Sequence, residues 1–189
     1  MAIATIDKAV VHATPSFSPC EEVHMTQVSD APSIQQRMSL IKGWKTEVII
    51  HAPQELVWNQ VTDFEAYSQW NPFVIEAHAE FKVGAKIRFL EDLKRFGQHW
   101  ISAQFLSIDP PNSFVWQGHF AAPFLFTVRH PFLLEAMGDR QTRFTQIHEN
   151  SGLLIPYLAW RGIYCVSHQG YLHYNQALKE RCESIAAQL

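Results

Sequence analysis

Several features that mark other classes of protein are missing from this chain. Its 15 Lys and Arg residues are scattered among 18 Asp and Glu residues, and the formal net charge is −3. A nucleic-acid-binding surface needs a basic cluster, so nucleic acid is not an expected partner. The sequence also has no basic start followed by an apolar stretch, and no uncharged apolar run of bilayer length. We therefore expect a soluble protein without stable membrane insertion.

Cysteine is scarce, with only Cys20, Cys165 and Cys182. No two of them form a CxxC pair and any disulfide scheme leaves one thiol over, which fits a reducing compartment and predicts a cytoplasmic location. Enzyme motifs are missing as well, since there is no GxSxG, P-loop or dinucleotide-binding fingerprint. Serine hydrolysis, nucleotide chemistry and hydride transfer therefore have no support, and no cofactor is expected.

The chain does contain a marked pair of helix signals between Ala52 and Pro72. Pro53 suits the first helical position, because its missing N–H would be unpaired there anyway, and Glu55 places negative charge in the first turn. Asp63 is placed to cap a second helix with its side chain. Pro72 disfavours helical geometry at the preceding residue and ends that helix. The segment thus predicts two short helices separated at Asp63.

This segment and its surroundings resemble the START-like (SRPBCC) superfamily, in particular its polyketide cyclase/dehydrase-type branch of hydrophobic-ligand domains. The matching positions run from about Lys45 to the C-terminus and are a strand ending at Ile50, Ala52-Pro53, Glu55, Trp58, Thr62-Asp63, Tyr67, Trp70-Asn71-Pro72, Val83-Gly84, Phe114-Val115-Trp116, Thr142-Arg143-Phe144, Gly152-Leu153-Leu154 and Asn175-Gln176-Ala177-Leu178-Lys179. The resemblance implies an α+β helix-grip fold, in which a curved antiparallel sheet wraps around a long C-terminal helix and encloses an apolar cavity. It implies no single activity, because relatives of this fold include carriers, sensors, cyclases and hydrolases.

Residues 1–40 predict a poorly ordered extension, and residues 41–189 the START-like domain. The strand candidates that follow the two helices are separated only by turn signals, which favours an antiparallel sheet. A three-residue turn at residues 121–123 predicts four cross-strand pairs: Phe120 with Phe124, Gly118 with Phe126, Trp116 with Val128, and Phe114 with His130. In that register the aromatic residues of both strands face inward. The register beyond Pro131 stays open, because a proline there allows a bulge.

From about Pro156 onward the apolar residues recur at helical spacing, which predicts the long gripped helix. Gly162, Ser167 and Gly170 lie on or beside its apolar stripe, although a mid-helix glycine is disfavoured by about 1 kcal/mol relative to alanine. Such small residues indicate either close packing of the helix on the sheet or an open cavity. The resemblance favours the cavity.

The chain has 13 Phe, 6 Trp and 5 Tyr residues. Aromatic residues usually form core, but several together can line a ligand site. The predicted lining is Trp70, Phe73, Phe89, Phe105, Trp116, Phe126 and Tyr171, and inward-facing strand positions add the polar side chains of His99, His130, Gln146 and His148. Each histidine is otherwise explained as exposed or as hydrogen-bonded to a neighbour.

His130 and His148 are also the candidate catalytic residues, with Glu135 or Glu149 as a partner carboxylate. The spacing of the three histidines matches no metal-ligand motif, so no metal site is expected. The uninterrupted apolar run from Gly152 to Trp160 predicts a lid over the cavity, a contact with a membrane or a partner, or simply a buried helix start.

The leading hypothesis is a noncatalytic carrier or sensor that binds a small hydrophobic molecule, such as a lipid, an isoprenoid or an aromatic polyketide. One alternative is a cyclase or dehydratase in which a cavity histidine moves protons. Another is a protein-interaction module that presents residues 152–160, which a filled cavity and an exposed run would favour. A monomer or homodimer is expected.

Overall fold

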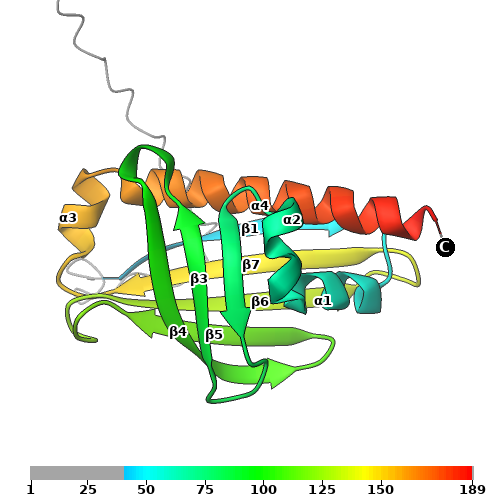
Figure 1. The fold of residues 1–189 in the computed structure, drawn as a ribbon, viewed down its shortest axis with the longest axis horizontal. Coiled ribbons are helices and arrows are strands. Elements are labelled where there is room, and N and C mark those ends of the chain that lie inside the picture. The colour runs from blue at the N-terminus through cyan, green and yellow to red at the C-terminus, as the bar shows by residue number, and fades with distance from the viewer. Residues whose placement is uncertain (1–40, 189) are drawn as a thin grey trace, which may run out of the picture.

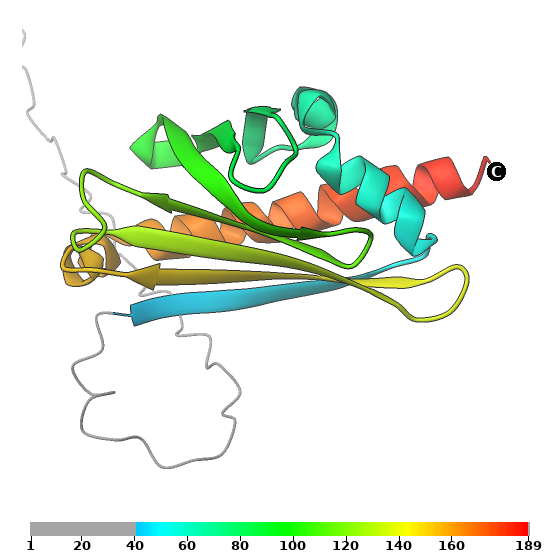
Figure 2. The same cartoon turned by 90° about the horizontal axis from the view of Figure 1, so that it is seen from below.

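The protein, described by a computed structural model for residues 41–188, forms one seven-stranded antiparallel sheet around a long helix. The predicted extension at residues 1–40 lies outside the described residues. The strands are β1 (Ile41–Ile50), β2 (Val74–Ala79), β3 (Lys86–Asp92), β4 (Gln98–Asp109), β5 (Ser113–His119), β6 (Thr127–Ala136) and β7 (Thr142–Ser151), in the order β1-β7-β6-β5-β4-β3-β2. Figures 1 and 2 show the sheet curving around α4 (Ile163–Ala186). The predicted helix-grip fold is confirmed.

The two short helices follow β1 as predicted. They are α1 (Gln54–Thr62) and the consecutive turns η2 (Phe64–Ala66) and α2 (Tyr67–Trp70). Pro53 lies one position before α1, where its carbonyl accepts hydrogen bonds from the amides of Leu56 and Val57. The side chain of Asp63 caps nothing, so that part of the prediction is wrong. Asn71 ends the second helix. Its Oδ1 accepts hydrogen bonds from the amides of residues 73 and 74, which turns the chain into β2.

The predicted pairing of β5 with β6 is wrong by two residues. Gly118 pairs with Val128, Trp116 with His130, and Phe114 with Phe132. The loop is longer than the predicted three residues. The Phe120 amide donates a hydrogen bond to the Phe126 carbonyl oxygen, so residues 121–125 form the loop. Side chains alternate with a period of two, so an even shift leaves the same residues facing inward. Pro131 causes no bulge, because β6 pairs with β7 in one register on both sides of it.

The C-terminal helix is not continuous from Pro156. A short helix α3 (Ile155–Trp160) is separated from α4 by Gly162, which has a left-handed backbone. The small residue Gly170 does not leave an open space, because a Cβ atom there would lie 2.2 Å from the ring of Phe73. Close packing, not a cavity, explains that glycine. Among residues 41–188, none of the helices has the length and apolar character needed to cross a bilayer.

Candidate ligand-binding site

The space between the sheet and α4 is almost filled with side chains. A cavity of about 20 Å³ lies among them. It is lined by Phe64, Tyr67, Val74, Ala77, Ile87, Phe89, Phe114, Trp116, Phe132, Tyr171 and Tyr174. Such a space holds about one water molecule, whereas ligand sites in proteins usually measure about 300–1,000 Å³. The interior therefore has the lining of an apolar ligand site without its volume.

A chain of hydrogen-bonded polar side chains crosses this apolar interior from β7 to α4. His148 and His130 face each other through their Nδ1 atoms at 3.0 Å, and His130 Nε2 lies 3.0 Å from Gln146 Oε1. The Gln146 amide nitrogen in turn donates to Asn175 Oδ1. With Gln146 in this orientation, His130 donates through Nε2–H and accepts at Nδ1 from His148. All four side chains are buried.

A second buried polar pair lies beside this chain. The hydroxyl of Tyr171 on α4 donates to Oε1 of Glu91 on β3 at 2.9 Å. The Tyr171 ring also packs against His130, with ring centroids 4.7 Å apart, and it lines the cavity. Tyr171 therefore connects the carboxyl group, the histidine chain and the cavity wall.

Trp44 on β1 covers the outer end of the histidine chain. Its indole stacks on His148 with ring centroids 4.4 Å apart and an angle of 9° between the planes. The preceding residue, Gly43, allows the two strands to approach, since a Cβ atom there would lie 2.3 Å from the His148 carbonyl oxygen. The stack holds the imidazole against β1 and keeps water away from it.

Burial sets the protonation of these groups. It lowers the pKa of His148 to about 3, and together with the charge of His148 it holds the pKa of His130 well below its usual range. Burial also raises the pKa of Glu91 to about 7, against the hydrogen bond from Tyr171, which lowers it. Both histidines are thus neutral at pH 7, while Glu91 is near its midpoint. Of the buried groups in this site, Glu91 is the one poised to exchange a proton at neutral pH.

The sequence identified part of this site correctly. His130, Gln146 and His148 are brought together as an inward-facing polar group, and Phe89, Trp116 and Tyr171 line the cavity. Phe73 and Phe105 are buried in the surrounding core, and Phe126 is half-buried at its edge. Whether any of these residues binds a ligand stays a prediction.

Other expectations are wrong in position. His99 is exposed at the start of β4, beyond the core, and its Nε2 lies 2.7 Å from the Phe96 carbonyl oxygen. Glu135 and Glu149 do not reach the histidines, because they project from the outer face of the sheet into ion pairs with Arg143 and Arg129. The run from Gly152 to Trp160 contributes no side chain to the cavity wall.

Three residues of the site were missed: Trp44, Glu91 and Asn175. Two of them left a signal. Glu91 alternates with Phe89 and Ile87 along β3, and Asn175 lies four residues after Tyr171, so both belong to inward-facing positions. Trp44 carried no comparable signal, because its role depends on how closely β1 approaches β7.

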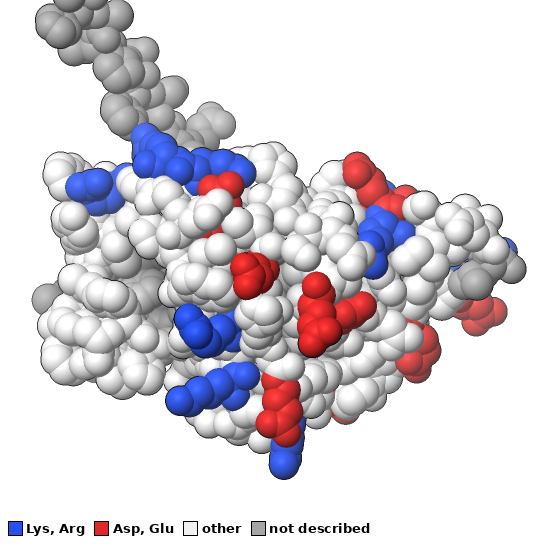
Figure 3. Space-filling view, viewed as in Figure 1, with Lys and Arg blue, Asp and Glu red and all other residues white. Residues whose placement is uncertain are grey.

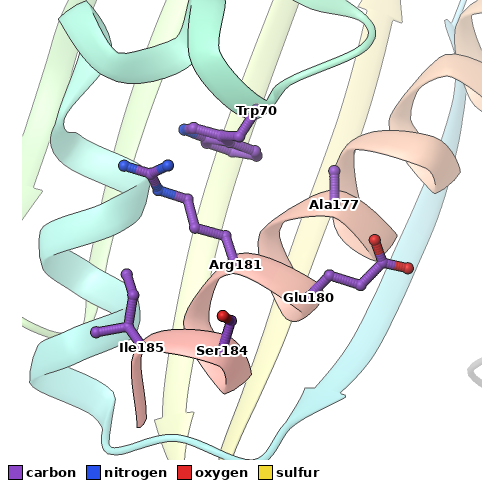
Figure 4. Close-up of a pocket in the computed structure, with 6 residues that line it drawn as sticks. All are labelled: Trp70, Ala177, Glu180, Arg181, Ser184 and Ile185. Carbon is purple, nitrogen blue, oxygen red and sulfur yellow. The ribbon is translucent and has the colours of Figure 1, made fainter. Parts of the chain in front are cut away.

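Trp70 lines an outer groove instead of the cavity. The groove, about 480 Å³ in volume, lies between α2 and the C-terminal half of α4 and is lined by Trp70, Ala177, Glu180, Arg181, Ser184 and Ile185 (Figure 4). The Trp70 ring also packs edge-on against Tyr67 and Tyr174, at centroid distances of 5.1 and 5.3 Å. Both tyrosines line the cavity. Trp70 therefore stands between the outer groove and the interior.

Comparison with known proteins identifies the family. Residues 51–157 match the family described as Activator of Hsp90 ATPase homolog 1-like protein. The chain belongs to this family. The match runs from the start of the two short helices to α3 and includes every strand except β1. No curated protein sequence matches the chain at a significant level.

The family match, together with solved structures that share the fold, confirms the predicted resemblance to the START-like superfamily. The Zhui aromatase/cyclase from Streptomyces sp. R1128 is 16% identical, with a TM-score of 0.64 over 76% of this chain and 94% of that chain. A START superfamily protein from Mycobacterium smegmatis is 17% identical, with a TM-score of 0.61 over 76% of this chain and 98% of that one. The di-domain ARO/CYC StfQ from the steffimycin biosynthetic pathway is 11% identical, with a TM-score of 0.66 over 81% of this chain and 54% of that one. These likenesses show the fold.

Proposed function

We propose that this protein binds a small, largely apolar molecule between its sheet and α4, as a carrier or sensor. The observation that carries the proposal is the buried chain His148–His130–Gln146–Asn175 beside an aromatic-lined cavity. A core of matched apolar residues would avoid the free energy of desolvating these groups. Within this buried chain of residues, the Asn175 Nδ2 atom makes no hydrogen bond. Convergent polar groups within apolar walls are typical of ligand sites.

Binding requires the interior to open, because 20 Å³ does not hold a ligand. The residue best placed to open it is Trp70, which separates the 480 Å³ groove from the cavity-lining tyrosines. Its indole Nε1 is buried and makes no hydrogen bond, so its rotation would break none. Rotation of Trp70 would join the groove to the cavity and give an apolar ligand access to the interior. Arg181 would then lie at the entrance.

A second candidate function, acid–base catalysis on a polyketide-like substrate, is favoured by Glu91. Its pKa of about 7 suits proton transfer at neutral pH, and its partner Tyr171 forms part of the cavity wall. Two of the solved structures with this fold are named as an aromatase/cyclase and an ARO/CYC protein. The neutral, mutually bonded histidines favour binding over catalysis, because protonating either one is opposed by its burial.

Uptake of the neutral fluorescent probe N-phenyl-1-naphthylamine tests the proposal. Trp116→Ala should enlarge the cavity and tighten probe binding, whereas Ala77→Phe should fill it and abolish binding. His78→Phe adds the same ring to the exposed outer side of β2 and serves as the matched control, which should bind like the unaltered protein. Binding that does not respond to Ala77→Phe, or no binding by any variant, would overturn the proposal.

Catalysis is separable from binding in the same system. Glu91→Gln should keep probe binding whether the protein is a carrier or an enzyme. If the protein is an enzyme, Glu91→Gln should abolish turnover of a poly-β-ketone substrate, measured by loss of its carbonyl absorbance. An unaltered protein that binds the probe but leaves such substrates unchanged supports the carrier or sensor function.

A further inference from the structure

One end of the molecule carries a concentration of exposed apolar side chains, here called the apolar end: Phe120, Phe124, Leu153, Tyr157 and Trp160. Trp160, Phe120 and Phe124 are the most exposed large apolar residues in the described part of the chain, at 79%, 67% and 65%. Scattered single apolar residues are normal on protein surfaces, but a contiguous group marks an interaction site. These five come from only two segments, the β5–β6 loop and the β7–α4 connection.

The two segments are fixed to each other by the backbone. The amides of Leu153 and Leu154 donate to the carbonyls of Phe124 and Leu125 at 3.1 and 3.0 Å. The approach depends on Gly152, which has φ +130° and where a Cβ atom would lie 2.4 Å from the Leu125 carbonyl oxygen. The Tyr157 and Trp160 rings lie 6.2 Å apart on α3. The apolar end is therefore a constructed surface and not a pair of independent loops.

Positive charge surrounds the apolar end. The Arg161 guanidinium lies over the Tyr157 ring at 6.0 Å, and Lys42 lies over the Tyr164 ring at 5.8 Å. Arg95 donates to the Arg161 carbonyl and so belongs to the same margin. In Figure 3 the end that carries α3 is an uncoloured surface with Lys and Arg side chains along its upper edge, while most acidic side chains lie toward the middle and the opposite end.

The acidic residues near this end do not cancel its charge. Asp92 is paired with Lys94 at 2.9 Å, and Glu149 with Arg129 at 2.8 Å. Both pairs are neutral as units. Lys42 and Arg161 therefore add positive charge at the apolar end.

We propose that the apolar end docks on the surface of an anionic lipid bilayer. Trp and Tyr side chains settle at the headgroup level of a bilayer, Phe and Leu reach the acyl chains, and neighbouring Lys and Arg side chains attract anionic headgroups. A stable protein partner would use about 20–30 residues on each side. Five side chains on two segments are too small a face for that, but they suffice for shallow insertion supported by charge.

This docking goes beyond ligand binding and does not depend on it, because the apolar end contributes no residue to the cavity wall. It also accounts for the exposure of α3, which a buried helix start or a lid would not show. A protein that docks on a bilayer through this end would keep the groove beside Trp70, at the other half of α4, directed away from the membrane (Figures 1 and 4).

Flotation with lipid vesicles tests the inference on the full chain. Vesicles of phosphatidylcholine with about 30% phosphatidylserine mimic an anionic leaflet and should carry the protein upward. Vesicles of pure phosphatidylcholine should carry much less of it. The combined change Phe124→Ser and Trp160→Ser should weaken binding by at least about tenfold, given the apolar area withdrawn from the bilayer. Arg161→Gln should weaken it by about fivefold and make it less sensitive to salt.

The matched control replaces two exposed apolar residues elsewhere, Val83→Ser and Met137→Ser, and should float like the unaltered protein. Equal flotation of the Phe124/Trp160 variant and the control would overturn the inference, as would equal binding to neutral and anionic vesicles. A concentration-dependent dimer that the Phe124/Trp160 variant abolishes, seen by light scattering without flotation, would assign the surface to a second copy of the chain. If the Phe124/Trp160 variant loses flotation but still takes up the probe, bilayer docking and ligand binding are separate functions.

Discussion

The interior and the apolar end of this protein depart from the ordinary distribution of side chains in opposite directions. In the interior, two histidines, two amides and a carboxyl group are buried among aromatic rings. At the apolar end, aromatic rings are left in water although the fold has a core to hold them. Buried polar side chains and exposed aromatic side chains both lower the stability of the folded protein unless they serve another role. This contrast matches the two proposed roles, ligand binding in the interior and bilayer docking at the apolar end.

Removal of the central residue of the buried histidine chain should have the largest effect on stability. His130→Ala leaves His148 and Gln146 without a partner and opens a void, so the free energy of unfolding should fall by roughly 3–5 kcal/mol. Urea unfolding followed by circular dichroism measures it. The exposed histidine offers a control, since His99→Ala should change stability by less than about 0.5 kcal/mol. Similar losses for the two variants would mean that the buried chain contributes nothing special.

Acid should destabilise the protein through the same histidines. The pKa of His148 is about 3 in the folded protein and 6.5 in the unfolded chain, so unfolding takes up a proton between these values. The free energy of unfolding should therefore fall as pH drops from 7 to 4, by roughly 3 kcal/mol from His148 alone, and His130 adds to the fall. His148→Gln should flatten this dependence in urea titrations run at several pH values. An unchanged slope in that variant would contradict the assignment.

Glu91 should act with the opposite sign. Its pKa is about 7 when folded and 4.5 when unfolded, so its carboxyl group favours the folded state below pH 4.5, and that contribution is lost as pH rises through 7. Relative to the unaltered protein, Glu91→Gln should gain up to about 3 kcal/mol of stability between pH 4.5 and pH 8. Measuring the difference between the two proteins cancels the histidine contribution. A constant difference across this range would show that Glu91 titrates normally.

Changes at the apolar end should have the smallest effect on stability. Trp160→Ser removes a side chain that is 79% exposed, so the free energy of unfolding should change by less than about 0.5 kcal/mol. Thermal unfolding checks this, and Trp58→Ser, at a buried tryptophan of α1, provides the contrast with a loss of about 3 kcal/mol or more. If Trp160→Ser is as harmful as Trp58→Ser, the apolar end is part of the core and not a docking surface.

Local patterns were sufficient to predict an antiparallel sheet, the two short helices and the inward direction of His130, Gln146 and His148, whereas the helix-grip arrangement was predicted from the family resemblance. These depend on proline and glycine signals and on the period of two, which the sequence carries directly. The structure was needed where distant segments meet. The ring of Phe73 occupies the space beside Gly170, and Trp44 stacks on His148 through the approach allowed by Gly43. No local pattern shows which strand or ring lies opposite a glycine. The sequence alone therefore does not distinguish a filled interior from an open cavity.

The alternation of side chains along β5 and β6 limits how the register of this hairpin can change. A shift of β6 by two residues against β5 keeps His130 facing α4, whereas a shift by one residue turns His130 to the outer side of the sheet and brings Arg129 or Pro131 inward. A single residue inserted within β6 would therefore need a bulge to absorb it, whereas an insertion in the loop leaves the register unchanged. Because Phe120 and Phe124 lie in this loop, the apolar end can change in length while His130 stays directed toward α4.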